Sequence, residues 1–129
     1  MNHTDIFDLA AMFARDMANK DEAYFRNIIG RCYYSVYHHA VLVLEKKLQW
    51  SASIDKFGVH ERVISRLDNY PKSTHSERIK EIERLKEDII KLKKARTKSD
   101  YRLQTIVLNV DAAYMLKLSE RIITNLNQL

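Results

Sequence analysis

The sequence contains little of what ends helices or cross-links chains: two glycines, one proline and one cysteine in 129 residues. So few glycines and prolines favour long helices with few tight turns. A single cysteine excludes an internal disulfide and is typical of a reducing compartment. No apolar run follows a basic start, so no signal peptide is expected, and the apolar run at 40–44 is too short to cross a membrane. We therefore expect a cytoplasmic protein without membrane contact.

The sequence also lacks the motifs that hold metals and common cofactors. No two of its five histidines have the i,i+4 spacing that places two ligands on one helical face, and a lone cysteine cannot build a thiolate site. It has no glycine-rich phosphate loop, no nucleophile elbow and no dinucleotide fingerprint. We therefore expect neither a metal nor a cofactor.

Apolar and charged residues are abundant. Apolar types make up 46% of the chain, which excludes a disordered protein, and the length suffices for one domain, 1–129, with a buried core. The net charge of +5 has one origin: segment 72–98 holds ten basic and five acidic residues, and the rest of the chain balances. Such a segment is typical either of a surface that faces a polyanion or of a solvated helix face.

Apolar residues recur at helical spacing in five segments. We expect helices over 4–19, from about 21 to about 49, over 59–70, from Ser73 or Thr74 to about 95, and from Asn109 to about 126. A loop at 50–58 and a connector at 96–110 interrupt the pattern. The sequence therefore predicts an all-α fold, an antiparallel bundle of four to five helices built on the long second helix.

The long helix has two distinct faces when successive residues are turned by about 100°. The apolar face consists of Phe25, Ile29, Cys32, Tyr33, Val36, Tyr37, Ala40, Val43 and Leu44. The opposite face consists of Tyr24, Asn27, Arg31, Tyr34, Ser35, His38 and Leu42. Arg31 and His38 lie two turns apart and are offset by about 20°, so they share a stripe directed away from the core. Gly30, inside this helix, indicates close packing against a neighbouring helix.

An arginine and a histidine on one exposed stripe can cleave RNA without a metal. The 2′-hydroxyl of the RNA is the nucleophile, and histidine can move protons because its pKa lies near neutrality. The planar guanidinium of arginine can pair with two phosphate oxygens and stabilise the charge that develops on phosphorus. The alternative is that Arg31 is an ordinary surface charge and His38 a surface or interface histidine.

The spacing of the two residues favours a site shared between two chains. Seven helical residues separate the Cα atoms by about 10 Å, and Arg31 leans toward the helix N-terminus, away from His38. A two-fold dimer with facing stripes would bring both pairs into one cleft, with Tyr24, Tyr34 and Leu42 buried between the chains. Alternatively, these three side chains pack against another helix of the same chain.

Two segments carry a resemblance to a known family. The sequence RCYYSVYHHA at 31–40 resembles the R-x-Y-Y-A-x-F-H-A signature of small prokaryotic HEPN domains. The sequence RTKSDY at 96–101 resembles their downstream R-x-x-A-D-Y motif, and VHERVI at 59–64 resembles the segment between the two. The resemblance extends from about residue 20 to the end of the chain.

The resemblance implies a helical bundle that forms a homodimer and acts as a metal-independent endoribonuclease, either the toxin of a toxin–antitoxin pair or a phage-defence effector. It implies that Arg31 and His38 are catalytic and that RNA is the substrate. The residues expected to support the site are Asn27, Tyr34, Ser35, Arg96, Asp100 and Tyr101. An antitoxin such as a small nucleotidyltransferase is an implied partner. The alternative is a non-catalytic HEPN binding module that docks a partner protein or a nucleotide.

The second motif is expected to be structural, fixing the end of the fourth helix through an Asp100–Arg96 contact. The first motif departs from the family pattern at several positions. Cys32 stands where active members often have Asn, Asp or His, and Ser35 and His39 replace common alanines. Ser35 is expected between Arg31 and His38 on the same face, where it could contact substrate or fill space.

Overall fold

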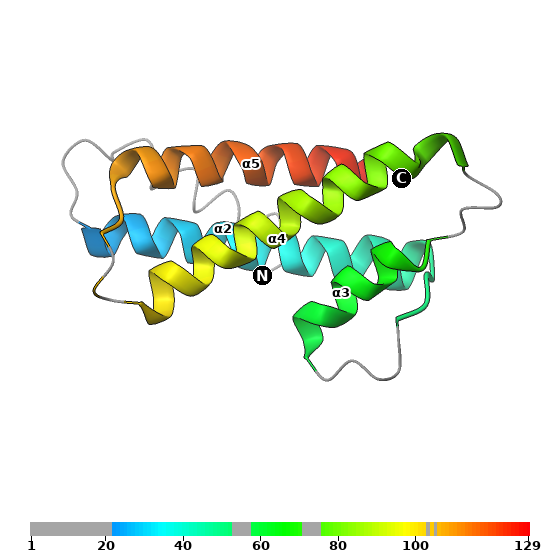
Figure 1. Cartoon of the computed structure of the whole chain (residues 1–129), viewed down its shortest axis with the longest axis horizontal. Coiled ribbons are helices and arrows are strands. Elements are labelled where there is room, and N and C mark those ends of the chain that lie inside the picture. Colours follow the sequence, from blue (N-terminus) through cyan, green and yellow to red (C-terminus); the bar gives the residue numbers. More distant parts are fainter. Residues whose placement is uncertain (1–21, 53–57, 71–75, 103, 105) are drawn as a thin grey trace.

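The structure is a computed structural model that describes residues 22–52, 58–70, 76–102, 104 and 106–129. The helix expected over 4–19, and the caps expected at Ser73 or Thr74, lie outside these residues. The described part contains four α-helices and no strand (Figure 1), and thereby confirms the all-α prediction. The helices are α2 (Glu22–Val41), α3 (Val59–Asp68), α4 (Ile79–Tyr101) and α5 (Asn109–Asn127).

Helix α2 is the central element, because it packs against α5, α4 and α3. Helix α4 crosses in front of α2 and α5 and runs in the opposite direction to both, whereas α2 and α5 lie side by side and run parallel (Figure 1). The expected antiparallel order therefore describes α4 against its neighbours, whereas α3 runs in the same general direction as α2 and α5. The shorter α3 packs on α4 and on the C-terminal end of α2.

The core forms where the apolar stripes of the helices meet. Helix α4 contributes Ile82, Leu85, Ile89 and Leu92, and α5 contributes Ala112, Leu118, Ile122 and Leu126, all buried. With the partly buried Met115 between Ala112 and Leu118, these residues recur three and four positions apart, as in an apolar helical stripe. One ion pair joins α4 to α5, since both oxygens of the buried Asp88 accept hydrogen bonds from Arg121, at 3.0 and 3.1 Å.

Helix α4 extends through Tyr101, about six residues beyond its expected end, because its last turns are held by polar contacts. Arg26 of α2 donates to the backbone carbonyls of Ser99 and Lys98, at 2.8 and 3.2 Å. An arginine that binds the last carbonyls of a helix satisfies acceptors that have no partner within the helix. The apolar spacing stops at 95, so hydrophobic periodicity did not reveal this extension.

The ends of two other helices also differ in detail from the prediction. Helix α2 continues into a π-helical segment, Leu42–Lys47, and the chain then leaves the helix at Gln49, whose φ is 57°. The start of α5 is capped by Asp111, whose carboxylate accepts a hydrogen bond from the backbone N–H of Leu108 at 2.8 Å, and not by Asn109. Helix α3 ends at Asp68, two residues before its expected end.

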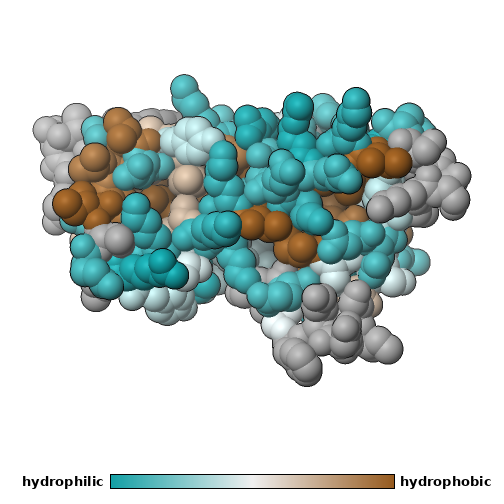
Figure 2. All heavy atoms as spheres, viewed as in Figure 1, coloured by the Kyte–Doolittle hydropathy of each residue, from teal (hydrophilic) through white to brown (hydrophobic). Residues whose placement is uncertain are grey.

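The described surface has an apolar area at the start of α5, which Figure 2 shows at the left end of the molecule. Four large apolar side chains are exposed around it: Ile106, Leu108, Val110 and Tyr114. Two others, Tyr34 and Leu42, are exposed on α2, with 41% and 47% of their surface accessible. None of the described helices is both long and apolar enough to pass through a bilayer.

Candidate functional site

Arg31 and His38 both lie on the outer side of α2, as their spacing predicted. Arg31 is partly buried and His38 is exposed. The Nε of Arg31 donates a hydrogen bond to the side-chain oxygen of Asn27 at 2.7 Å. Because Asn27 lies one turn nearer the helix N-terminus, this bond draws the guanidinium away from His38. A single chain therefore presents the two groups along about 10 Å of helix and not as one compact pair.

The His38 ring is enclosed by tyrosines on two sides. It stacks on Tyr34 with ring centroids 6.4 Å apart and an interplanar angle of 26°, and it meets Tyr37 edge-on at 5.3 Å. Such contacts limit the orientations of the imidazole, although the residue is exposed. An exposed imidazole in a restricted orientation is suited to proton transfer with a bound substrate.

A buried arginine from α4 holds Tyr34 in place. Arg96 is 9% exposed, and its Nη2 donates to the hydroxyl oxygens of Tyr34 at 3.0 Å and Tyr101 at 3.1 Å. Its Nε donates to a carboxylate oxygen of Asp100 at 3.0 Å, so the expected Asp100–Arg96 contact is confirmed. The second motif thus connects directly to the first, through the Arg96–Tyr34 hydrogen bond.

Aromatic rings surround the same guanidinium. We call the residues around it the Arg96 cage: Tyr33, Tyr34, Tyr101 and Asp100. The central carbon of Arg96 lies 5.6, 5.4 and 5.1 Å from the ring centroids of Tyr33, Tyr34 and Tyr101, within the range of cation–π attraction. Burial acts to lower the pKa of Arg96, but the hydrogen bond and charge interactions with Tyr34, Tyr101 and Asp100 outweigh it and raise the pKa. The cage therefore contains a permanent positive charge.

The placement of Ser35 differs from the prediction. Ser35 is fully buried, so it does not lie on the exposed face between Arg31 and His38. The helical wheel assumed one buried side, but α2 packs against α5 on one side and α4 on another, which widens its buried arc. Ile28 and His39 are buried for the same reason. Tyr24 is partly buried against the core and so contributes little free surface to the stripe.

Gly30 is buried where α2 faces Asp100 of α4, but the spacing there does not require a glycine. A Cβ built on Gly30 would lie 3.5 Å from one carboxylate oxygen of Asp100. This is an ordinary contact distance, so α2 and α4 could approach as closely at the Arg96 cage with an alanine at this position.

Two departures from the family pattern lie in the α2–α5 interface and not at the candidate site. Cys32 is fully buried, and burial raises the pKa of its thiol to about 12, although a hydrogen bond with Ser119 opposes the rise. His39 is also buried, with its Nε2 2.5 Å from the side-chain oxygen of Asn127. Both side chains contact α5, so they are part of the packing.

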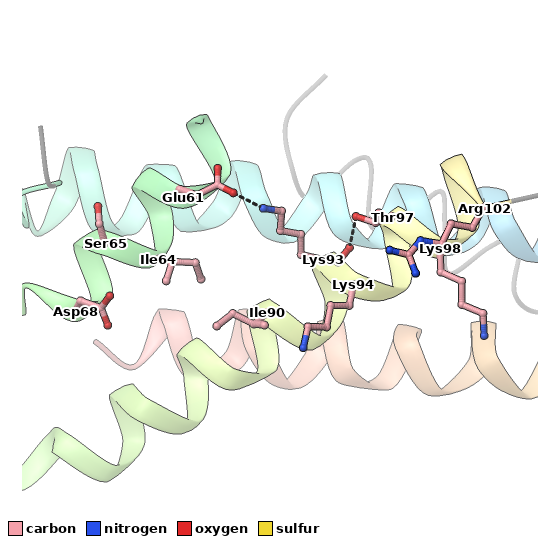
Figure 3. A pocket seen from close by; sticks show the side chains of 10 residues that line it. All are labelled: Glu61, Ile64, Ser65, Asp68, Ile90, Lys93, Lys94, Thr97, Lys98 and Arg102. Carbon is pink, nitrogen blue, oxygen red and sulfur yellow. Dashed lines mark hydrogen bonds and ion pairs between the residues drawn. The ribbon is translucent and has the colours of Figure 1, made fainter. Parts of the chain in front are cut away.

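Sequence reasoning missed a groove beside the site, because it forms only when α3 lies against α4. The groove has a volume of about 710 Å³ and is lined by residues of both helices and by Arg102 (Figure 3). The basic segment of the sequence was visible, but its partner helix was not predictable from charge alone. Among the described residues, no group of three or more His, Cys, Asp or Glu side chains could hold a metal ion.

The candidate site is thus two connected units on α2 and α4. Asn27 holds Arg31, and the Arg96 cage holds Tyr34, which stacks on His38. Seven of the eight residues predicted for the site are connected by direct contacts, in one group of two and one group of five. The eighth, Ser35, lies in the core. Comparisons with protein-family models, curated proteins and solved structures find no match to this chain.

Proposed function

We propose that the protein is a metal-independent endoribonuclease that acts as a homodimer. The observation that carries the proposal is the arrangement on α2: an exposed His38 held by tyrosines, with Arg31 two turns away on the same outer face. A solvated face would not need a buried arginine from another helix to fix one of its tyrosines. The resemblance of 31–40 and 96–101 to HEPN motifs supports the same reading.

The proposed reaction uses the RNA as its own nucleophile. His38 removes the proton from a 2′-hydroxyl, whose oxygen then attacks the adjacent phosphorus and forms a 2′,3′-cyclic phosphate. The bond from phosphorus to the 5′-oxygen breaks, and this oxygen takes a proton from a protonated histidine or from water. Arg31 binds the non-bridging phosphate oxygens and stabilises the negative charge of the five-coordinate intermediate.

The proposed homodimer places an arginine opposite a histidine, an arrangement that a single chain lacks. In one chain, the contact with Asn27 holds the Arg31 guanidinium away from His38. In a two-fold pair with facing α2 helices, Arg31 of one protomer lies opposite His38 of its partner. The exposed side chains of Tyr34 and Leu42 lie on the same face and provide apolar surface for the interface.

The proposed biological role is that of a toxin or a phage-defence effector in the cytoplasm, controlled by a partner such as a small nucleotidyltransferase. This part depends on the resemblance alone. An antitoxin encoded next to the protein, and growth arrest on expression without it, are the expected signs.

The second candidate function is a non-catalytic module that docks a partner protein or a nucleotide. One observation favours it: the position after Arg31, where a polar helper is often found in active members, holds a buried thiol. The two candidates differ in whether RNA is cut.

Purified protein incubated with RNA in excess EDTA tests the proposal. We expect cleavage with 2′,3′-cyclic phosphate ends, and a loss of at least about 100-fold for Arg31→Ala and for His38→Ala. The matched control is Arg84→Ala, since Arg84 is an exposed arginine on α4 far along the chain from the site. Intact RNA with the wild type, or equal cleavage by all three variants, would overturn the proposal.

A further inference from the structure

The groove between α3 and α4 has an apolar floor and two ends of opposite character (Figure 3). Ile64 of α3 and Ile90 of α4 lie in its middle. Lys94, Lys98 and Arg102 line one end, and Asp68 lines the other. A ligand lying along this groove would meet cations at one end, aliphatic surface in the middle and a carboxylate at the other end.

At the basic end, the two lysines carry charge that no acid in the described parts of the chain neutralises. Lys93 pairs with Glu61 at 2.6 Å, and Asp68 pairs with Lys86 at 2.6 Å. Lys94 and Lys98 are exposed and form no ion pair with any acid in the described parts of the chain. Two exposed lysines one turn apart, next to an open groove, are suited to phosphate groups.

The dimensions and lining of the groove fit nucleotides of a single strand. Its volume of about 710 Å³ lies within the usual range for binding sites, which are mostly apolar with a few placed polar groups. The aliphatic side chains of Ile64 and Ile90 give the groove apolar lining against which a base can pack. A carboxylate such as Asp68 accepts a hydrogen bond from the exocyclic amino group of a base such as cytosine.

A series of contacts runs from the last turn of α4, next to the basic end of the groove along the chain, to the candidate site. Tyr101 lies at the end of α4, one turn after Lys98, and is 66% exposed. Its hydroxyl binds Arg96, which also binds Tyr34, and Tyr34 stacks on His38. A strand leaving the basic end of the groove therefore has exposed tyrosine rings along its way to His38.

We propose that the α3–α4 groove binds the RNA strand beside the cut, with its phosphates on Lys94, Lys98 and Arg102 and one base over Ile64 and Ile90. The amino edge of that base is directed to Asp68, which gives the site a preference for cytosine or adenine over uracil. The choice of RNA as the polyanion rests on the proposed function. The geometry of the groove supplies the binding mode and the base preference.

Binding can be measured apart from cleavage with a 2′-O-methyl oligonucleotide, because it has no free 2′-hydroxyl and cannot be cut. We expect the double variant Lys94→Gln/Lys98→Gln to bind a fluorescent 2′-O-methyl cytidine oligomer about tenfold more weakly than the wild type. The slope of log affinity against log salt should fall in magnitude by about 1.4, since each phosphate contact to a single strand contributes about 0.7. Fluorescence anisotropy across a salt series gives both quantities.

The matched control is Lys80→Gln/Arg84→Gln, which removes the same charge with the same spacing from the other end of α4. It should bind as the wild type does. Equal weakening by both double variants would overturn the proposal, because the effect would then be one of net charge. Displacement of the oligomer by a poly-glutamate peptide of equal charge would also overturn it, as would displacement by free cytidine triphosphate at the same concentration of nucleotide.

The base preference is tested with a matched pair of variants. Asp68→Ala removes the carboxylate, and Lys86→Gln breaks the same ion pair but keeps the carboxylate. We expect the cytidine oligomer to lose its advantage over a uridine oligomer in Asp68→Ala and to keep it in Lys86→Gln. If the wild type binds the cytidine and uridine oligomers equally, the assignment of Asp68 to the base is overturned. If the oligomer binds in a groove-dependent way but no RNA is cleaved, the proposed endoribonuclease function is refuted, whereas the assignment of the groove to RNA binding still holds.

Discussion

At the residue scale, Arg96 shows how a charged side chain becomes part of a core. Its guanidinium has five donors, and the Arg96 cage supplies a carboxylate, two hydroxyl oxygens and three aromatic faces. Each of these contacts uses the planar shape of arginine as well as its charge. The residue therefore fixes the position of Tyr34, and through it the stacking partner of His38.

Replacing Arg96 by lysine keeps the positive charge and removes the planar guanidinium. We expect Arg96→Lys to lower the free energy of unfolding by about 2–3 kcal/mol, because a lysine cannot reach Asp100, Tyr34 and Tyr101 together and loses hydrogen bonds made by a mostly buried charge. Urea denaturation measures this, with Arg84→Lys on the exposed side of α4 as the control. Equal stability of the two variants would mean that the cage contributes no energy.

Cys32 makes stability depend on pH at the alkaline end. Burial raises the pKa of its thiol from 9.0 to about 12, so between these values the folded chain holds a proton that the unfolded chain releases. Stability is therefore unaffected by this group below pH 9 and falls by about 1.4 kcal/mol per pH unit above it. Burial likewise raises the pKa of Tyr33, which adds to the loss above its ordinary value of 10.0.

Urea denaturation at pH 8, 9 and 10 measures this dependence. Cys32→Ala should be less stable at every pH, because it leaves a small cavity, but its unfolding free energy should fall less between pH 9 and 10 than that of the wild type. The same slope in both proteins would contradict the assignment to Cys32. Alkylation by iodoacetamide should be slow in the folded protein and fast in urea, since only the thiolate reacts.

At the element scale, hydrophobic spacing was sufficient to place the helices and insufficient to place their neighbours. The stripes of α4 and α5 identified their buried residues, since a helix with one packed side shows it in its period. Helix α2 has several packed sides, so the wheel put Ser35 on the wrong one. The last turns of α4 depend on Arg26, seventy-odd residues away, and no local pattern contains such a contact.

In the candidate site too, local spacing predicts the contacts within one helix and not the contacts between helices. Arg31 and His38 could be paired from their spacing, because both lie on one helix and helical geometry fixes their relation. The hydrogen bond from Arg96 to Tyr34 joins residues 62 positions apart, so no local spacing predicts it and only the packing of α2 on α4 defines it. The α3–α4 groove has the same origin in tertiary packing.

Gly30 tests how closely α2 and α4 approach. A Cβ at this position meets Asp100 at 3.5 Å, an ordinary contact distance, so Gly30→Ala should fit and should raise the free energy of unfolding by about 0.5–1 kcal/mol through helix propensity. Gly30→Leu should lower it by about 1–3 kcal/mol, because the larger side chain must displace Asp100 from Arg96. Thermal denaturation of the pair measures this, and a destabilised alanine variant would show that the helices cannot move even slightly apart.

At the scale of the whole molecule, the two surfaces proposed to be functional differ in composition. The outer face of α2 exposes apolar side chains, with Leu42 at 47% and Tyr34 at 41%, whereas the α3–α4 groove exposes lysines. Exposed apolar side chains suit a surface that excludes water when two chains associate. Exposed lysines suit a surface that binds a polyanion. A dimer built on α2 would leave the groove of each protomer open to a strand.

The dimer can be tested at Leu42, because a half-exposed side chain contributes little to the stability of a single chain. We expect Leu42→Glu to shift the protein from dimer to monomer in light scattering, since two new carboxylates would face each other across the two-fold axis, while the far-UV circular dichroism stays unchanged. RNA cleavage should fall with the dimer and should recover at higher protein concentration.

The matched control is Leu108→Glu at the start of α5, where a leucine is 53% exposed in the other apolar area of the surface. If α2 forms the interface, this variant remains dimeric and active, because its charge lies away from the two-fold axis. If Leu108→Glu dissociates the dimer and Leu42→Glu does not, the interface lies at α5. Arg31 and His38 would then have to act within one chain, across the distance that Asn27 now maintains between them.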